Sequence, residues 1–264
     1  MNALITAFFY KRPAVSEYAW AEMAEMLTLW LTHLRGPGGY TGDIALLGNL
    51  ASLDELPTDA AELADAEGVT LLPFDDVAES HQATLLNTIL AHDVVPAEAY
   101  DVVMQLDLDV LAQRDVTPLF ARGEKLRAAA SGAAVFARAH ARSIMTKAEA
   151  ASAVLRRPRL AKRRGISSCA FSCLGSTWHG QMSAWAELIR ERRDRFPLPS
   201  LSDQSYLNLA WLLGVLDAES MPAEHVVHGN WSAAADPILL HFPVPGRLAK
   251  MRDHATIISA VATV

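Results

Sequence analysis

Short apolar runs alternate with longer segments of helical period along this chain, and Gly, Pro or Asp residues separate them. Nearly continuous apolar runs are typical of strands covered on both faces, and their alternation with helices is typical of a parallel sheet. The pattern therefore predicts an α/β fold in which helices flank a mostly parallel sheet. The predicted strands are residues 1–10, 43–48, 69–74 and 101–106.

The first long helical segment has a single apolar face. Its large apolar side chains recur at three- and four-residue steps, and Gly36 and Pro37 end the pattern. These side chains are Met23, Met26, Leu27, Trp30, Leu31 and Leu34. We interpret this stripe as core. The acidic, Ala-rich stretch 53–68 predicts a solvated helix or connection without chemistry.

Composition and charge restrict the class of protein. The chain has 264 residues, of which 51% are hydrophobic and 20% are charged, as in ordinary globular enzymes. A formal net charge of -7 argues against a nucleic-acid partner, because duplex binding depends on neutralising phosphates. The one dense basic segment, 156–164, is interpreted as a solvated loop or as a contact for an acceptor, a phosphate or an acidic surface.

Cysteine usage and the N-terminus bear on the compartment. Cys169 and Cys173 are the only cysteines, so no disulfide framework is expected and a reducing compartment is compatible with the chain. Residues 1–10 lack a basic leader, which favours a first strand over a signal sequence. No apolar run reaches about 18 residues, so we expect no membrane span and a cytoplasmic protein.

Two carboxylates, Asp107 and Asp109, directly follow the predicted strand 101–106. The carboxyl ends of strands form the edge at which α/β sheets bind ligands. Burying unpaired carboxylates costs roughly several kcal/mol each, and a bound divalent cation removes this cost. Hard oxygen ligands suit Mg²⁺ or Mn²⁺, so the pair predicts a site for one of these ions.

A second apolar run, residues 237–240, ends in His241. An added imidazole ligand favours Mn²⁺, which accepts nitrogen more readily than Mg²⁺ does. An Asp-x-Asp alone, or one histidine among nine, is a weak signal. Their shared position at strand ends predicts that Asp107, Asp109 and His241 form one metal site.

Several segments resemble glycogenin-like glycosyltransferases, family 8 of the GT-A fold. Residues 105–111 and 115–120 resemble the family's metal-binding segment, in which a hydrophobic strand enters an Asp-x-Asp. Residues 39–44 resemble its turn into the second strand, and 203–208 resemble its Asp-Gln-x-x-x-Asn helix start. His241-Phe242 resembles its late His-Phe pair.

The resemblance implies a Rossmann-like GT-A fold and a metal-dependent transfer reaction. We expect one domain over 1–264, with a nucleotide-binding half at 1–125 and an acceptor-binding half at 126–264, and with a smaller subregion on the acceptor side. In the family, Mn²⁺ (or Mg²⁺) bound by the residues matching Asp107, Asp109 and His241 clamps the diphosphate of a nucleotide sugar, usually a UDP-sugar. A hydroxyl acceptor then receives the sugar with retained anomeric configuration.

The resemblance also implies roles for further residues. The first strand of the family lines the nucleoside pocket, which implies contacts of Thr6, Ala7 and Phe8 with the base or ribose. The Asp-Gln segment lies beside the sugar, so Asp203 and Gln204 are the candidates for contacting sugar hydroxyls and stabilising an oxocarbenium-like transition state.

The phosphate-binding lysine of the family has two candidates here, Arg247 and Lys250, of which Lys250 is favoured slightly. The family's Phe-Asn-Ala-Gly segment corresponds to 167–171 of this chain, where the Asn and Gly are absent. The identity of the sugar therefore does not follow from the resemblance.

Two other functions are compatible with the residues. A nucleotidyltransferase shares the sheet and the metal-bound diphosphate, but it usually has a Gly-rich loop behind the first strand, and residues 9–15 contain no glycine. A degenerate relative would bind a nucleotide or a protein without turnover, although both metal carboxylates are present. The sugar, the acceptor and any homo-oligomer are left open by the sequence.

Overall fold

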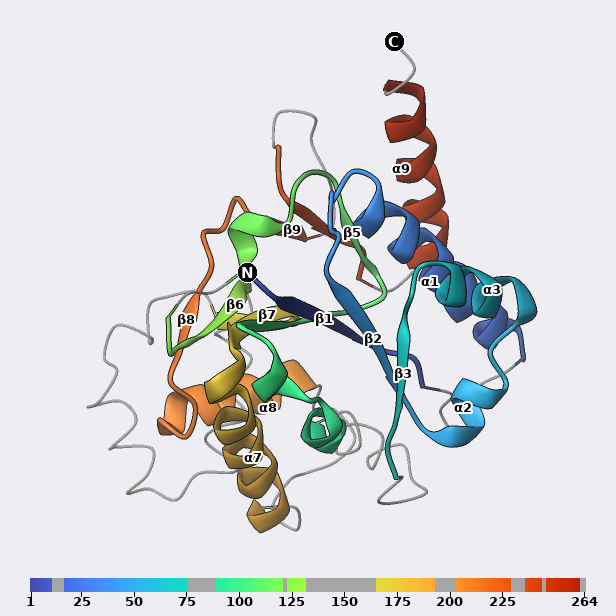
Figure 1. Cartoon of the computed structure of the whole chain (residues 1–264). Helices are drawn as coiled ribbons and strands as arrows, with labels where there is room; N and C mark the ends of the chain where they lie inside the picture. Colours follow the sequence, from blue (N-terminus) through green and yellow to red (C-terminus); the bar gives the residue numbers. More distant parts are fainter. Residues whose placement is uncertain are drawn as a thin grey trace.

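The computed structural model describes residues 1–10, 17–75, 89–120, 123–131, 165–192, 203–228, 236–243 and 246–261. Within these residues, a seven-stranded sheet has the order β3-β2-β1-β4-β7-β6-β8 (Figure 1). Its strands are β1 (Ala3–Phe8), β2 (Asp43–Gly48), β3 (Thr70–Pro73), β4 (Val102–Leu106), β6 (Leu126–Ser131), β7 (Gly165–Leu174) and β8 (Ala218–Ser220). The basic segment 156–164 and its expected role lie outside the described residues.

Strand direction agrees with the prediction of a mostly parallel sheet. β1 pairs in parallel with β2 and β4, β2 pairs in parallel with β3, and β6 pairs in parallel with β8. Only β7 in this sheet runs the other way, because it is antiparallel to both β4 and β6. The predicted α/β class is confirmed.

Helices bury both faces of the sheet. Alternate residues of one strand enter different cores: in β2, Ile44 and Leu46 pack on one side, and Ala45 and Leu47 pack on the other. The first core includes α1 (Glu17–Arg35), α3 (Thr58–Ala66) and α9 (Arg247–Val261); the second includes α7 (Gly175–Arg192) and α8 (Asp203–Leu213). Burial on both faces explains why these strands are apolar at nearly every position.

The predicted elements agree with the observed ones to within a few residues. The four predicted strands are β1 to β4, and the amphipathic segment that ends before Gly36 is α1. The stretch 53–68 holds the end of α2 (Leu50–Asp54) and all of α3. Short 3₁₀ turns occur as η1 (Ala91–Val94), η2 (Ala97–Ala99) and η3 (Thr117–Leu119).

A second, three-stranded sheet brings the end of the chain back to β4. Its order is β5-β10-β9, with β5 (Val110–Ala112), β10 (Leu239–His241) and β9 (Val226–His228). β10 is antiparallel to β5 and parallel to β9. Since β5 follows β4 after one turn, this pairing holds the C-terminal part of the chain beside the end of β4.

Gly246 precedes α9 with a φ of 73°, a left-handed conformation that favours glycine. This turn lets the chain leave β10 and begin α9 at Arg247, next to the same strand end. Among the described helices, none combines the length and the apolar content that crossing a bilayer demands.

Candidate metal and donor site

A tight turn after β4 carries Asp107 and Asp109. The Asp107 backbone N–H donates to the carbonyl of Cys169 at 2.9 Å, and the Val110 N–H donates to the carbonyl of Asp107 at 3.1 Å. The first bond fixes the turn to β7, and the second closes it. Asp109 is 8% exposed, whereas Asp107 is half-buried at the surface of the site.

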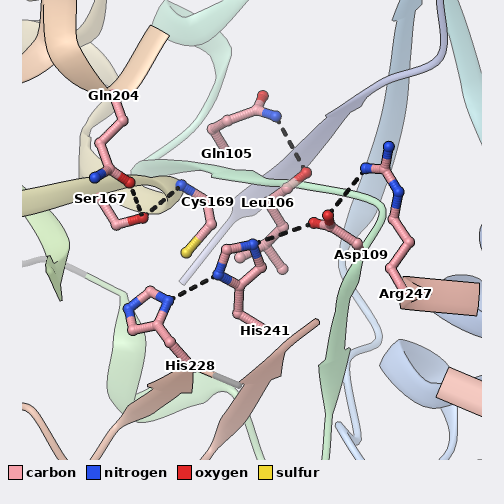
Figure 2. Close-up of polar contacts among 9 residues, drawn as sticks. All are labelled: Gln105, Leu106, Asp109, Ser167, Cys169, Gln204, His228, His241 and Arg247. Atoms are coloured by element: carbon pink, nitrogen blue, oxygen red, sulfur yellow. Dashed lines mark hydrogen bonds and ion pairs between the residues drawn. The ribbon is translucent and has the colours of Figure 1, made fainter. Parts of the chain in front are cut away.

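Pairing within the small sheet brings His241 to this turn. His241 lies opposite Val110 in the β5–β10 ladder, and the Phe242 N–H donates to the carbonyl of Asp109 at 2.9 Å. His241 Nε2 lies 3.5 Å from Asp109 Oδ1 (Figure 2). One ligand atom from each of Asp107, Asp109 and His241 lies within 4.8 Å of the other two. The structure thus brings together the three residues that the sequence nominated for a metal site.

Arg247 reaches the same carboxylate from the first turn of α9. Its guanidinium donates to Asp109 Oδ2 at 3.1 Å (Figure 2). Burial raises the pKa of the Asp109 carboxyl, and the charge and hydrogen bond of Arg247 partly counteract this rise. Lys250, one helical turn further along, is exposed.

The other carboxylate oxygen, Asp109 Oδ1, is buried and makes no hydrogen bond. An unsatisfied carboxylate oxygen costs roughly 1–3 kcal/mol or more when it is buried, because its hydration is lost without compensation. Two carboxylates and an imidazole form a donor set that suits Mn²⁺ or Mg²⁺. A divalent cation beside Oδ1 would satisfy this oxygen, so the residues present fit such an ion.

β7 bulges where it passes the site. Between Ala128 and Ala129 of β6, the pairing on β7 jumps from Phe171 to Ser167, so the three residues between them leave the β6 ladder. Bulges of this kind re-aim side chains and are frequent beside active sites. Cys169 belongs to this bulge, and its thiol approaches the imidazoles of His228 and His241.

The predicted Asp-Gln segment lies at the start of α8, which a buried amide fixes to β7. Asn208 accepts from the Ile166 N–H at 2.9 Å and donates to the Ile166 carbonyl at 2.5 Å. One helical turn earlier, Gln204 Oε1 accepts from the Ser167 hydroxyl at 3.0 Å (Figure 2). Asp203 is the first residue of α8. Gln204 of α8 is thus held beside the bulge of β7. The Cys169 carbonyl of the same strand accepts from the Asp107 N–H.

A pocket beside Asp107 has an empty volume of about 230 Å³ including its open mouth. It is lined by Phe8, Ile89, His92, Gln105, Asp107, Ser168, Phe171 and Trp185.

The three residues expected at the nucleoside differ in their exposure. Thr6 and Ala7 are fully buried, and the Thr6 hydroxyl donates to Gln105 Oε1 at 2.7 Å. Phe8 is partly exposed and lines the pocket. Of the three side chains, Phe8 is therefore the one that is accessible from the pocket.

His92 is buried among aromatic rings at the back of the pocket. Phe8, Phe171 and Trp178 have ring centroids 5.1 to 5.6 Å from its imidazole, and its Nδ1 makes no hydrogen bond. Burial lowers the pKa of His92 from 6.5 to about 3. The folded protein therefore keeps this imidazole neutral at physiological pH.

Replacing His92 with leucine is expected to reduce the loss of stability in mild acid. Between pH 6.5 and about 3 the unfolded chain binds a proton at His92 that the folded chain does not, so stability falls as pH falls. From pH 7 to pH 5 this proton costs about 2 kcal/mol. Between pH 7 and pH 5, the free energy of unfolding measured in urea should therefore decrease by about 2 kcal/mol less for His92→Leu than for the wild type. The exposed His179, changed to glutamine, should leave the wild-type pH dependence unaltered, and equal slopes for wild type and His92→Leu would contradict the assignment.

Sequence reasoning missed two residues of this region, His92 and His228. It included Asn208 in the Asp-Gln-x-x-x-Asn motif but did not predict its hydrogen bonds to Ile166. His228 ends a short apolar run in the same way as His241, so the rule that selected His241 also applies to it. His92 follows no comparable pattern. Its position depends on packing between η1 and α7, which the sequence does not reveal.

Comparison with known proteins identifies the fold. No protein-family model matches the sequence, and no curated protein matches it. Among solved structures, the galactosyltransferase LgtC in complex with donor and acceptor sugar analogues matches 97% of this chain and 96% of its own, with a TM-score of 0.60 and 12% identity. Mouse xyloside xylosyltransferase 1 matches 93% of this chain and 100% of its own, with a TM-score of 0.56 and 12% identity. The bifunctional glycosyltransferase WbbM matches 92% of this chain over 46% of its own, with a TM-score of 0.57 and 15% identity. The chain therefore has the GT-A glycosyltransferase fold that the resemblance to family 8 predicted.

Proposed function

We propose that this protein is a metal-dependent glycosyltransferase that moves a sugar from a nucleotide diphosphate sugar, of the UDP type, to a hydroxyl acceptor with retention. The observation that carries the proposal is the convergence of Asp107, Asp109 and His241 on the unsatisfied Asp109 Oδ1, at the carboxyl end of β4. The fold is shared with LgtC, which was solved with donor and acceptor sugar analogues, and this supports the same class of substrates.

Asp107, Asp109 and His241 would hold the cation, with Mn²⁺ preferred over Mg²⁺ because one ligand is an imidazole. When bound, the ion would neutralise the negative charge that builds on the departing diphosphate. Asp107 is half-buried and lines the pocket, so it joins the cation site to the space for the donor.

The donor sugar is assigned to the pocket between Asp107 and the bulge of β7. Ser168 and the pocket's aromatic wall suit a ring with one polar and one apolar face. Gln204 and Asp203 would contact sugar hydroxyls from the start of α8. Phe8 is assigned to the nucleoside side.

Arg247 is preferred to Lys250 as the cation for the diphosphate. This preference is supported by the 3.1 Å contact between Arg247 and Asp109, whereas Lys250 is exposed. Arg247→Met is expected to raise the KM for the donor about tenfold, since a charge-assisted hydrogen bond is worth roughly 1.5–3 kcal/mol. Lys250→Met should change this KM less than about twofold. Initial rates of UDP-sugar hydrolysis measure both KM values. A larger increase for Lys250→Met than for Arg247→Met would assign the diphosphate contact to Lys250 instead.

Thermal unfolding with a panel of nucleotide sugars, each with and without Mn²⁺, tests the function. A donor at a hundredfold excess over its Kd should stabilise the protein by about 2.7 kcal/mol, and the shift should require metal and nucleotide sugar together. Transfer from the best binder to an acceptor, or slow hydrolysis without one, would then show turnover. Diphosphate release from a nucleoside triphosphate and a sugar phosphate would identify a nucleotidyltransferase instead. Binding without any turnover would identify a non-catalytic relative.

A further inference from the structure

We propose that His228 is a positioning residue that fixes the tautomer of His241 and thereby turns the Nε2 lone pair of His241 toward the cation site. The inference rests on the proposed metal site. His228 lies outside the Asp107–Asp109–His241 set, and its two ring nitrogens contact His241 and Ala130.

The first step is the backbone contact of His228. Its Nε2 lies 2.7 Å from the carbonyl oxygen of Ala130 in β6. A carbonyl oxygen can only accept a hydrogen bond, so this nitrogen must carry the proton. In a neutral imidazole the other nitrogen, Nδ1, then has a lone pair and acts as an acceptor.

The proton position on His228 determines the proton position on His241. The Nδ1 atoms of the two histidines are 2.7 Å apart (Figure 2). Because Nδ1 of His228 accepts, Nδ1 of His241 must carry the proton and donate it. The neutral His241 ring therefore has its lone pair on Nε2, the atom that lies 3.5 Å from Asp109 Oδ1.

The third step explains the contact with Asp109. Two acceptors, His241 Nε2 and Asp109 Oδ1, face each other without a hydrogen bond, which matches the unsatisfied state of Oδ1. A neutral His241 with its proton on Nε2 would require His228 to carry protons on both nitrogens. A cation between two lone pairs makes the observed arrangement favourable, and metal-bound histidines usually donate their other N–H in this way.

The same contacts argue against an independent soft-metal site. Ligand atoms of Cys169, His228 and His241 also lie within 4.8 Å of one another. Both nitrogens of His228 are, however, already used by Ala130 and His241. We therefore assign His228 to the support of His241 rather than to a second ion.

The topology makes this support rigid. His228 and His241 are register partners in the parallel β9–β10 pair, so their side chains lie on the same face of the small sheet. Ala130 belongs to β6 of the large sheet, one residue beyond the β7 bulge. The chain of hydrogen bonds thus ties the orientation of a metal ligand to the packing of the two sheets.

Mn²⁺ affinity, measured by the electron paramagnetic resonance of free Mn²⁺, tests the inference on three proteins. His228→Leu removes the acceptor and should weaken Mn²⁺ binding about 10- to 100-fold, as expected for loss of a partner that orients a ligand. His228→Asn offers an amide oxygen where Nδ1 was, so its affinity should return to within a few-fold of wild type. Thermal unfolding of each metal-free protein shows that the variants are folded. Wild-type affinity in a folded His228→Leu would overturn the proposal.

A second readout needs neither metal nor activity. Nitrogen-15 NMR of metal-free protein, with the His241 signals assigned from the spectrum of His241→Gln, should show a protonated Nδ1 and an unprotonated Nε2 at His241. His228→Leu should turn this single tautomer into a mixture. A proton on Nε2 of His241 in the wild type would overturn the proposal. Because this measurement is made without the ion, a wild type that fails to bind Mn²⁺ refutes the proposed function but leaves the tautomer result to decide the role of His228.

Discussion

Replacing Asp109 with asparagine is expected to abolish Mn²⁺ binding and to lower the rate of sugar transfer about a thousandfold. Asp109 is the buried carboxylate of the proposed metal site, and a neutral amide would lose the charge that draws the cation to it. A loss of about 4 kcal/mol of transition-state stabilisation corresponds to a factor of about a thousand, and metal ions supply stabilisation of this size. Calorimetric titration with Mn²⁺ and initial rates with the best UDP-sugar measure the two effects.

Unfolding in urea separates this loss from damage to the fold. Burial raises the pKa of the Asp109 carboxyl even though Arg247 donates to its Oδ2, so the charged carboxylate is unfavourable in the metal-free fold, and metal-free Asp109→Asn should be as stable as the wild type or more stable. Asp65→Asn is the matched control, because it removes the same charge from an exposed position on α3. It should keep full affinity and activity. Normal Mn²⁺ binding by folded Asp109→Asn would refute the metal site.

Replacing Gln204 with alanine is expected to lower kcat about 100-fold while leaving the Kd for Mn²⁺ unchanged. The Ser167 hydroxyl donates to Oε1 of this amide, which sets its orientation and presents Nε2 as the group that would donate to a sugar hydroxyl. A preorganised donor that acts in the transition state is worth roughly 10²–10³ in kcat. Steady-state rates at saturating donor measure kcat, and Mn²⁺ titration measures the site that should not change.

Two further variants make the result specific to Gln204. Gln181 lies on α7, where its side-chain oxygen accepts from the Asp217 N–H, and Gln181→Ala should retain wild-type kcat. Ser167→Ala removes the hydroxyl that donates to Oε1 of Gln204 and should lower kcat by a smaller factor than Gln204→Ala does. An unchanged kcat in Gln204→Ala would remove this residue from the catalytic machinery. Equal losses of Mn²⁺ affinity and kcat would instead indicate a structural effect on the site.

Much of the fold was predictable because local patterns and strand burial agree. Strands covered on both faces need apolar residues at nearly every position, and segments such as 43–48 and 101–106 are nearly continuous in apolar residues. The bulge in β7 was not predictable. It depends on how β6 and β4 pair with opposite edges of one strand, which involves residues far apart in the chain.

The candidate site divides in the same way. Asp107, Asp109 and His241 were found because each ends an apolar run, and strand ends share one edge of a sheet. The place of Arg247 beside Asp109, and the exposed position of Lys250, follow from the direction of α9 after Gly246. Arg247 and Lys250 are only three positions apart, and this spacing cannot reveal which of the two cations faces Asp109, which lies more than a hundred residues away in the sequence.

The sequence by itself determined the α/β class, the first four strands, the first helix and the ligand types of the candidate metal site, because these depend on periodicity and on the chemistry of single side chains. Only the tertiary structure decided that His228 holds His241, that Asn208 fixes α8 to β7, and that Asp109 keeps one oxygen without a hydrogen bond. These features depend on atoms within about 3 Å of each other, supplied by strands and helices that the sequence separates. Distances of that kind are set by packing, which no local pattern encodes.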